Sequence, residues 1–167
     1  MIFGLENLSE LFSIFHDGDI ARFTSSGSNL SLEVEISYLA QRVNPSYRAL
    51  QIALQNAREI QFETWPNDPN AKPNVLSSLT EIFEPQLEIL SGEVAGDCLK
   101  IICNQPLSKC GYSGGELLLK ADSAFVTDEG GKVYSIEELR QICGGYWSDW
   151  ENKNANRLPT RTLIKRS

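Results

Sequence analysis

The sequence is poor in the residues on which many hydrolytic and metal-dependent sites are built. It contains one histidine, His16, in 167 residues. A three-histidine zinc site, an H-E-x-x-H protease and a phosphohydrolase that needs several histidines are therefore excluded. The four cysteines include no C-x-x-C pair, so neither a zinc ribbon nor a thioredoxin-type redox pair is indicated (Cys98, Cys103, Cys110 and Cys143). We expect reduced thiols, no metal and no cofactor.

Long apolar runs are also lacking. No stretch approaches the roughly 18 apolar residues that a membrane-spanning helix needs. The first residues carry Glu6 and Glu10 and have no basic region, unlike a signal peptide. We therefore expect a cytoplasmic protein that does not associate with a membrane.

Basic residues are fewer than acidic ones, 15 against 22, which gives a net charge of −7. The basic residues gather at the C-terminal end, because residues 151–167 hold five lysines and arginines and one glutamate. We predict a single domain over residues 1–150 and a basic tail over 151–167, whose flexibility is left open. An acidic domain repels phosphate backbones, so no nucleic-acid partner is expected. It suits a basic protein partner, or it simply maintains solubility.

Hydrophobic spacing predicts the fold class. Residues 5–15 place apolar side chains three and four apart, as in a short amphipathic helix. Residues 30–38 alternate apolar and polar side chains, which predicts a strand with one buried and one solvated face. With a hairpin at 87–103 and further alternating segments, the pattern favours an α+β fold. We expect a mainly antiparallel sheet of about eight or nine short strands, with two or three short helices packed on one face.

Turn and capping residues predict where two later helices begin and end. Asn74 is expected to cap a short helix that includes Val75 and Phe83. Ser135 and Glu138 form a capping-box pattern at the start of another helix, and Gly144-Gly145 is expected to end it.

A hydrolase motif at residues 111–115 is interpreted as a turn. Gly111-Tyr112-Ser113-Gly114-Gly115 fits the G-x-S-x-G pattern of a nucleophile elbow. That elbow lies between a strand and a helix, with its histidine later in the chain. Here a strand is predicted to follow, and the histidine precedes the serine. We expect a glycine-rich turn that leads into a strand.

His16, Asp17 and Asp19 form the first candidate polar site. His16 with a neighbouring aspartate could act as a base in a small hydrolase, and Asp19 could complete a cation site. The alternative is structural: Asp17-Gly18 form a turn, and His16 caps the first helix, at whose C-terminal end positive charge is favoured.

Glu33 and Glu35 form the second candidate site, because they share one face of the predicted strand. They would lie about 6.7 Å apart, and Glu63 would join them if its strand were nearby. Such a pair could serve inverting glycoside hydrolysis, but a contact surface for a basic partner is the favoured interpretation.

The aromatic candidates are Trp65, Tyr146, Trp147 and Trp150. Trp65 is expected on the polar side of its strand if Ile60 and Phe62 point inward. The three C-terminal aromatics either pack in the core or form an exposed anchor for a partner.

The opening of the chain carries a resemblance. Phe15-His16-Asp17-Gly18, followed by an amphipathic hairpin and apolar strands to Phe62, resembles the first part of small bacterial proteins, some grouped with immunity proteins of polymorphic toxin systems. The resemblance implies a cytosolic binding protein without enzymatic chemistry. Our hypothesis is a non-enzymatic protein-binding module with an acidic surface. The alternatives are a small hydrolase that uses His16 and a homo-oligomeric, for instance dimeric, structural subunit.

Overall fold

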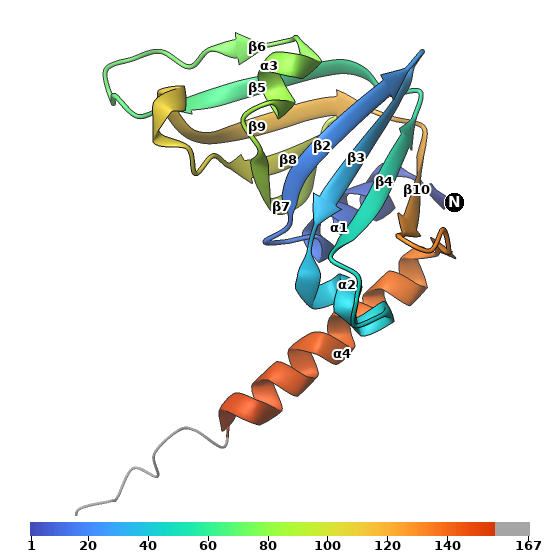
Figure 1. Ribbon diagram of the computed structural model, residues 1–167. Coiled ribbons are helices and arrows are strands. Elements are labelled where there is room, and N and C mark those ends of the chain that lie inside the picture. Colours follow the sequence, from blue (N-terminus) through green and yellow to red (C-terminus); the bar gives the residue numbers. More distant parts are fainter. Residues whose placement is uncertain (156–167) are drawn as a thin grey trace, which may run out of the picture.

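The computed structural model describes residues 1–155 (Figure 1). Its strands and helices follow in this order: β1 (Ile2–Phe3), α1 (Leu5–Ile14), β2 (Asp19–Ser26), β3 (Asn29–Glu35), α2 (Ser37–Val43), β4 (Ala49–Gln55), β5 (Arg58–Pro66), β6 (Val75–Leu76), α3 (Leu79–Phe83), β7 (Leu87–Ala95), β8 (Cys98–Asn104), β9 (Tyr112–Lys120), β10 (Ser123–Asp128), β11 (Val133–Tyr134) and α4 (Ile136–Ala155), with a 3₁₀ turn at Ser108–Cys110.

The strands form one antiparallel sheet in the order β1-β10-β4-β3-β2-β7-β8-β9-β5-β6, with β11 added beside β10. The α+β class and the antiparallel sheet are thereby confirmed. The described residues form eleven strands and four α-helices, which is more of each than the sequence predicted. The additional strands β1 and β6 are only two residues long, too short to show an alternating pattern.

The sheet consists of two halves joined by a short pairing. Strand β2 ends the first half, and β7 begins the second. They pair only through Asp19 with Glu88 and Ile20 with Leu87. Beyond Ile20 the pairing stops because the residues before β7 are Pro85, which has no N–H, and Gln86, whose φ is 51°. The two halves therefore diverge from this junction (Figure 1).

One face of the sheet and helix α1 form the core. Strand β3 alternates as predicted, with Leu30, Leu32 and Val34 buried and the intervening Glu33 more accessible. Helix α1 packs on β7 and buries Leu8, Leu11, Phe12 and Ile14. It approaches so closely that a Cβ on Gly92 would lie 2.1 Å from the Ser9 carbonyl oxygen. Gly92 is thus required by contact with the helix.

Two boundary predictions were wrong. The predicted strand 30–38 ends at Glu35, and Tyr38 belongs to α2, where its hydroxyl donates a hydrogen bond to the carbonyl of His16 at 2.6 Å. Asn74 does not cap a helix. Its backbone N–H donates to the Thr64 hydroxyl and its carbonyl accepts from the Thr64 N–H, so the following residues form β6 and α3 begins only at Leu79.

Helix α4 also differs from its prediction at one end. The capping box is confirmed, since the Glu138 carboxylate accepts from the Ser135 N–H at 2.8 Å and Ser135 Oγ accepts from the Glu138 N–H at 3.2 Å. Gly144-Gly145 do not end the helix, which continues to Ala155 and extends away from the sheet (Figure 1). The first five residues of the predicted tail are therefore helical, and residues 156–167 lie outside the described part. None of the described helices is long and apolar enough to cross a membrane.

Candidate functional site

Three carboxylates from neighbouring strands lie side by side at the junction of the two sheet halves. Asp19 of β2 is paired with Glu88 of β7 on one side and with Glu35 of β3 on the other. Residues directly opposite each other on paired strands project from the same face. We call Glu88, Asp19 and Glu35 the acidic ladder. Glu33 extends it along β3 on the same face.

The surroundings of Asp19, the central member of the acidic ladder, favour its protonated form. Partial burial, followed by the charges of Glu88 and Glu35, raises the pKa of Asp19 above its usual value. Like charges directly opposite each other destabilise a sheet. The ionised ladder is therefore a local repulsion that the rest of the fold offsets.

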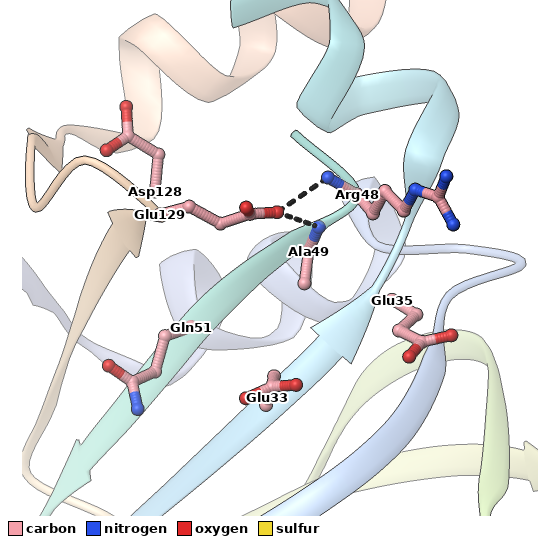
Figure 2. A pocket seen from close by; sticks show the side chains of 7 residues that line it. All are labelled: Glu33, Glu35, Arg48, Ala49, Gln51, Asp128 and Glu129. Carbon is pink, nitrogen blue, oxygen red and sulfur yellow. Dashed lines mark hydrogen bonds between the residues drawn. The ribbon is translucent and has the colours of Figure 1, made fainter. Parts of the chain in front are cut away.

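A hollow of about 440 Å³ lies beside the ladder (Figure 2). It is lined by Glu33, Glu35, Arg48, Ala49, Gln51, Asp128 and Glu129. The Glu129 carboxylate accepts hydrogen bonds from the backbone N–H groups of Arg48 at 2.6 Å and Ala49 at 3.0 Å, and these bonds hold the pKa of Glu129 below its usual value. Glu129 thus fixes the start of β4.

Asp128 is also engaged in the fold, and its carboxylate points away from Glu33 and Glu35 in Figure 2. Burial alone would raise the pKa of Asp128. Hydrogen bonds from the Tyr134 hydroxyl at 2.6 Å and from the backbone of Lys132 and Gly130 outweigh burial and lower it. The carboxylates of the hollow that remain available are those of Glu33 and Glu35, and Glu33 lies 3.9 Å from Arg22 Nε.

Glu63 does not join this surface. Strands β2, β7, β8 and β9 separate its strand, β5, from β3. Glu63 instead lies opposite Glu116 of β9. Trp65 projects from the same face, opposite Gly114, while Phe62 and Thr64 point into the core. The predicted outward position of Trp65 is confirmed, and a Cβ on Gly114 would lie 3.1 Å from its ring.

His16 forms a hydrogen bond with the backbone at the edge of strand β7. Asp17-Gly18 form the predicted turn, with Asp17 at a φ of 63°. The expectation that His16 caps α1 was wrong, because its Nδ1–H donates to the Leu90 carbonyl of β7 at 2.7 Å. Its Nε2 lies 3.1 Å from Asp17 Oδ1. In the described part of the chain the ring bonds no serine, threonine or cysteine side chain.

Ser13 forms hydrogen bonds with the same edge of β7. Its hydroxyl accepts from the Gly92 N–H and donates to the Gly92 carbonyl, both at 3.1 Å. Side chains from the end of α1 therefore pair the backbone groups of β7 that no strand covers. Residues 1–155 hold no group of three or more histidine, cysteine, aspartate or glutamate side chains suited to a metal ion.

The motif at residues 111–115 is next to a strand, as predicted, but only Gly111 belongs to the turn, because β9 begins at Tyr112 and includes the rest of the motif. Gly111 adopts a φ of 77° after the 3₁₀ turn, and Ser113 lies within strand β9. Gly115 is required by close packing, since a Cβ there would lie 2.3 Å from the Glu63 carbonyl oxygen. Strand β9, with no helix directly after the serine, is not the setting of a nucleophile elbow.

The C-terminal aromatics divide into a packed and an exposed part. Tyr146 packs on Tyr38 of α2, with ring centroids 4.6 Å apart, and lies under the Arg42 guanidinium. Trp147 and Trp150 contact each other at 6.0 Å and remain 38% and 50% exposed. Arg42 also bonds Asp149 at 2.6 Å, so α4 is anchored to α2 up to this exposed pair.

Sequence reasoning missed Glu88 and the true neighbours of Asp19. Asp19 was grouped with His16 because the two are close in the chain, whereas its neighbours in space are Glu35 and Glu88. The only sequence signal for Glu88 is its polar position in a strand pattern, which does not reveal the partner strand. Compared with models of known protein families, with curated proteins and with solved structures, the chain matches none of them.

Replacement of His16 tests whether the residue stabilises the fold through its hydrogen bond with Leu90, the sealing role, or has a chemical role. His16→Ala leaves the Leu90 carbonyl without its donor and should lower the free energy of unfolding by about 1 kcal/mol. His16→Asn places an amide donor close to the position of Nδ1 and should restore most of this loss. Urea titrations monitored by circular dichroism measure both, and equal loss in the two variants would contradict the sealing role.

Asp19 and Glu129 should contribute to the free energy of unfolding with opposite signs at pH 7. Folded Asp19 holds its proton more tightly than the unfolded chain does, so its ionisation weakens the fold. Asp19→Asn should raise stability at pH 7, and this gain should vanish below the ordinary aspartate pKa of about 3.9.

The matched control is Glu129→Gln. The folded state lowers the pKa of Glu129, so its stabilisation is present above the ordinary glutamate pKa and is lost as pH falls through the folded value. The variant should be less stable at pH 7, with a deficit that shrinks in acid. Thermal melts between pH 3 and pH 7 test the pair, and changes of the same sign would refute the assignment.

Proposed function

We propose that the chain is a non-enzymatic protein-binding module whose acidic face docks a basic protein. The acidic face consists of the acidic ladder together with Glu33. The observation that carries the proposal is the alignment of Glu88, Asp19 and Glu35 directly opposite one another on three neighbouring strands. Partial burial, followed by the charges of Glu88 and Glu35, also raises the pKa of Asp19. A basic side chain placed over the ladder would relieve this repulsion.

The other polar candidates support binding rather than bond breaking. The imidazole of His16 is engaged with the backbone of β7 and with Asp17, and Ser113 lies on a strand far along the chain from it. The resemblance implies an immunity-type role. In such a role, the acidic face would bind a basic toxin. Complementary charge would speed the association of such a pair.

Neutralisation of the acidic face should weaken binding of a basic probe. The double variant E33Q/E35Q should slow association with a fluorescent ten-residue lysine peptide by roughly tenfold at low salt. The matched control E63Q/E116Q makes the same change of net charge at another pair of neighbouring carboxylates. Stopped-flow fluorescence gives the rates. At about 1 M ionic strength the Debye length is only about 3 Å, so the difference should disappear. Equal slowing in both double variants would show that net charge alone attracts the peptide, contrary to the proposal.

A homo-oligomeric subunit is the second candidate, favoured by the exposure of Trp147 and Trp150 on a helix that extends beyond the sheet (Figure 1). Large aromatic side chains are typical anchors of protein interfaces. Light scattering at high concentration should then give a dimer mass for the full chain and a monomer mass for W147A/W150A. A monomer mass for the unaltered chain would exclude this candidate.

A further inference from the structure

Strand β2 presents an unpaired backbone edge. Its residues from Arg22 to Ser26 pair with β3 on one side. On the other side, β7 pairs only with Asp19 and Ile20. Within residues 1–155 no backbone group bonds the stretch 21–26 on that side.

The turn after β2 determines which backbone groups face outward. Gly27 has a φ of 59°, and Ser26 pairs with Asn29, so a two-residue turn joins β2 to β3. The pair that flanks such a turn is hydrogen-bonded, and bonded and non-bonded pairs then alternate along the hairpin. Ser25 and Phe23 therefore turn their N–H and C=O groups away from β3, toward the open edge.

Two other edges of the sheet are at least partly covered. Side chains of α1 seal the edge of β7, and β1 and β11 cover parts of the outer side of β10. Natural proteins protect exposed edges with charged side chains, proline, β-bulges or a covering element. In β2 a bulge lies between Ile20 and Arg22, and Arg22 is the only charged residue of the stretch 21–26. From Phe23 to Ser26 the strand has neither a charged residue nor a proline.

A partly apolar hollow of about 420 Å³ lies along this edge. Its apolar lining includes Ala21 and Phe23 of β2, Phe83 of α3 and Leu107. The rings of Phe23 and Phe83 are 5.3 Å apart, and Leu107 is 38% exposed. Next to a row of free backbone groups, this hollow offers a place for an apolar side chain.

A second copy of β2 would not fill the hollow in the register centred on Thr24. If two β2 edges paired antiparallel about Thr24, Phe23 would face Ser25 and Ala21 would face Gly27 of the other copy. Neither residue carries an apolar side chain. The edge and the hollow together fit an extended segment that alternates apolar and polar residues.

We propose that the free edge of β2 binds an extended segment of a partner polypeptide as an added strand, with an apolar side chain of that segment in the hollow beside Phe83. This inference rests on the proposed protein-binding function and specifies how the partner is held. Strand addition supplies backbone hydrogen bonds, and the pocket for alternate side chains supplies selectivity.

The test uses a neutral fluorescent peptide, acetyl-Thr-Leu-Thr-Leu-Thr-Leu-Thr-amide, and the full chain. The peptide should bind saturably in fluorescence polarisation. Ser25→Pro removes an outward N–H and should weaken binding at least about tenfold. Ser25→Ala keeps that N–H and should bind like the unaltered chain. Circular dichroism verifies that each variant is folded.

Altered peptides test the same inference without altering the protein. Only one set of alternate amides in an added strand faces β2, so N-methylation of either the leucine or the threonine amides should abolish binding, while methylation of the other set should not. Replacement of the leucines by serine should weaken binding at least about tenfold. Leu107→Ala should weaken it as well, through loss of part of the apolar lining of the hollow.

Three results would overturn the inference: no saturable binding to the unaltered chain, equal binding to folded Ser25→Pro, or a homodimer of the chain that Ser25→Pro dissociates. The last would make a second copy the occupant. Because the peptide is neutral, E33Q/E35Q should leave its binding unchanged. Failure of the acidic-face proposal would therefore appear with the lysine peptide alone.

Discussion

The pairing of β2 with β7 through two residues is the constraint on which the structure depends. Its inner pair, Ile20 and Leu87, is fully buried and joins the two sheet halves over one core. Its outer pair, Asp19 and Glu88, places two carboxylates side by side. Burial of one large aliphatic side chain contributes about 1.5–3 kcal/mol, whereas a cross-strand pair of charges is worth about 0.2–1 kcal/mol. The apolar side of the junction therefore outweighs the repulsion on its polar side.

The short junction also explains why one strand edge is sealed and another is open. On the N-terminal side of Asp19, the chain forms the turn at the end of α1. This turn places Ser13 and His16 where they can form hydrogen bonds with β7. In the other direction, Pro85 and Gln86 end the pairing, and β2 continues paired with β3 but without a partner on the side of β7. His16 and the free edge are thus two consequences of the same arrangement.

Local patterns predicted what depends on neighbours in the chain. The alternation in β3 and the capping box at Ser135 involve residues a few positions apart, and both were predicted correctly. The end of α4 was not, because anchoring of the helix by Arg42 to Gly145 and Asp149 outweighs the weak helix preference of two glycines. The acidic ladder could not be predicted either, since it requires knowing that β2 pairs with a strand formed much later in the chain.

The acidic ladder and the open edge both carry a cost in the isolated chain, and both involve strand β2. Repulsion at Asp19 destabilises its first residue, and unpaired backbone groups from Phe23 onward invite unwanted strand pairing. The one basic residue of β2 is Arg22, which lies 3.9 Å from Glu33, while the edge from Phe23 to Ser26 carries no charged side chain. A basic partner would add charge to the ladder, and an extended segment would supply backbone groups to this edge, so the two proposals address the two costs of the same strand.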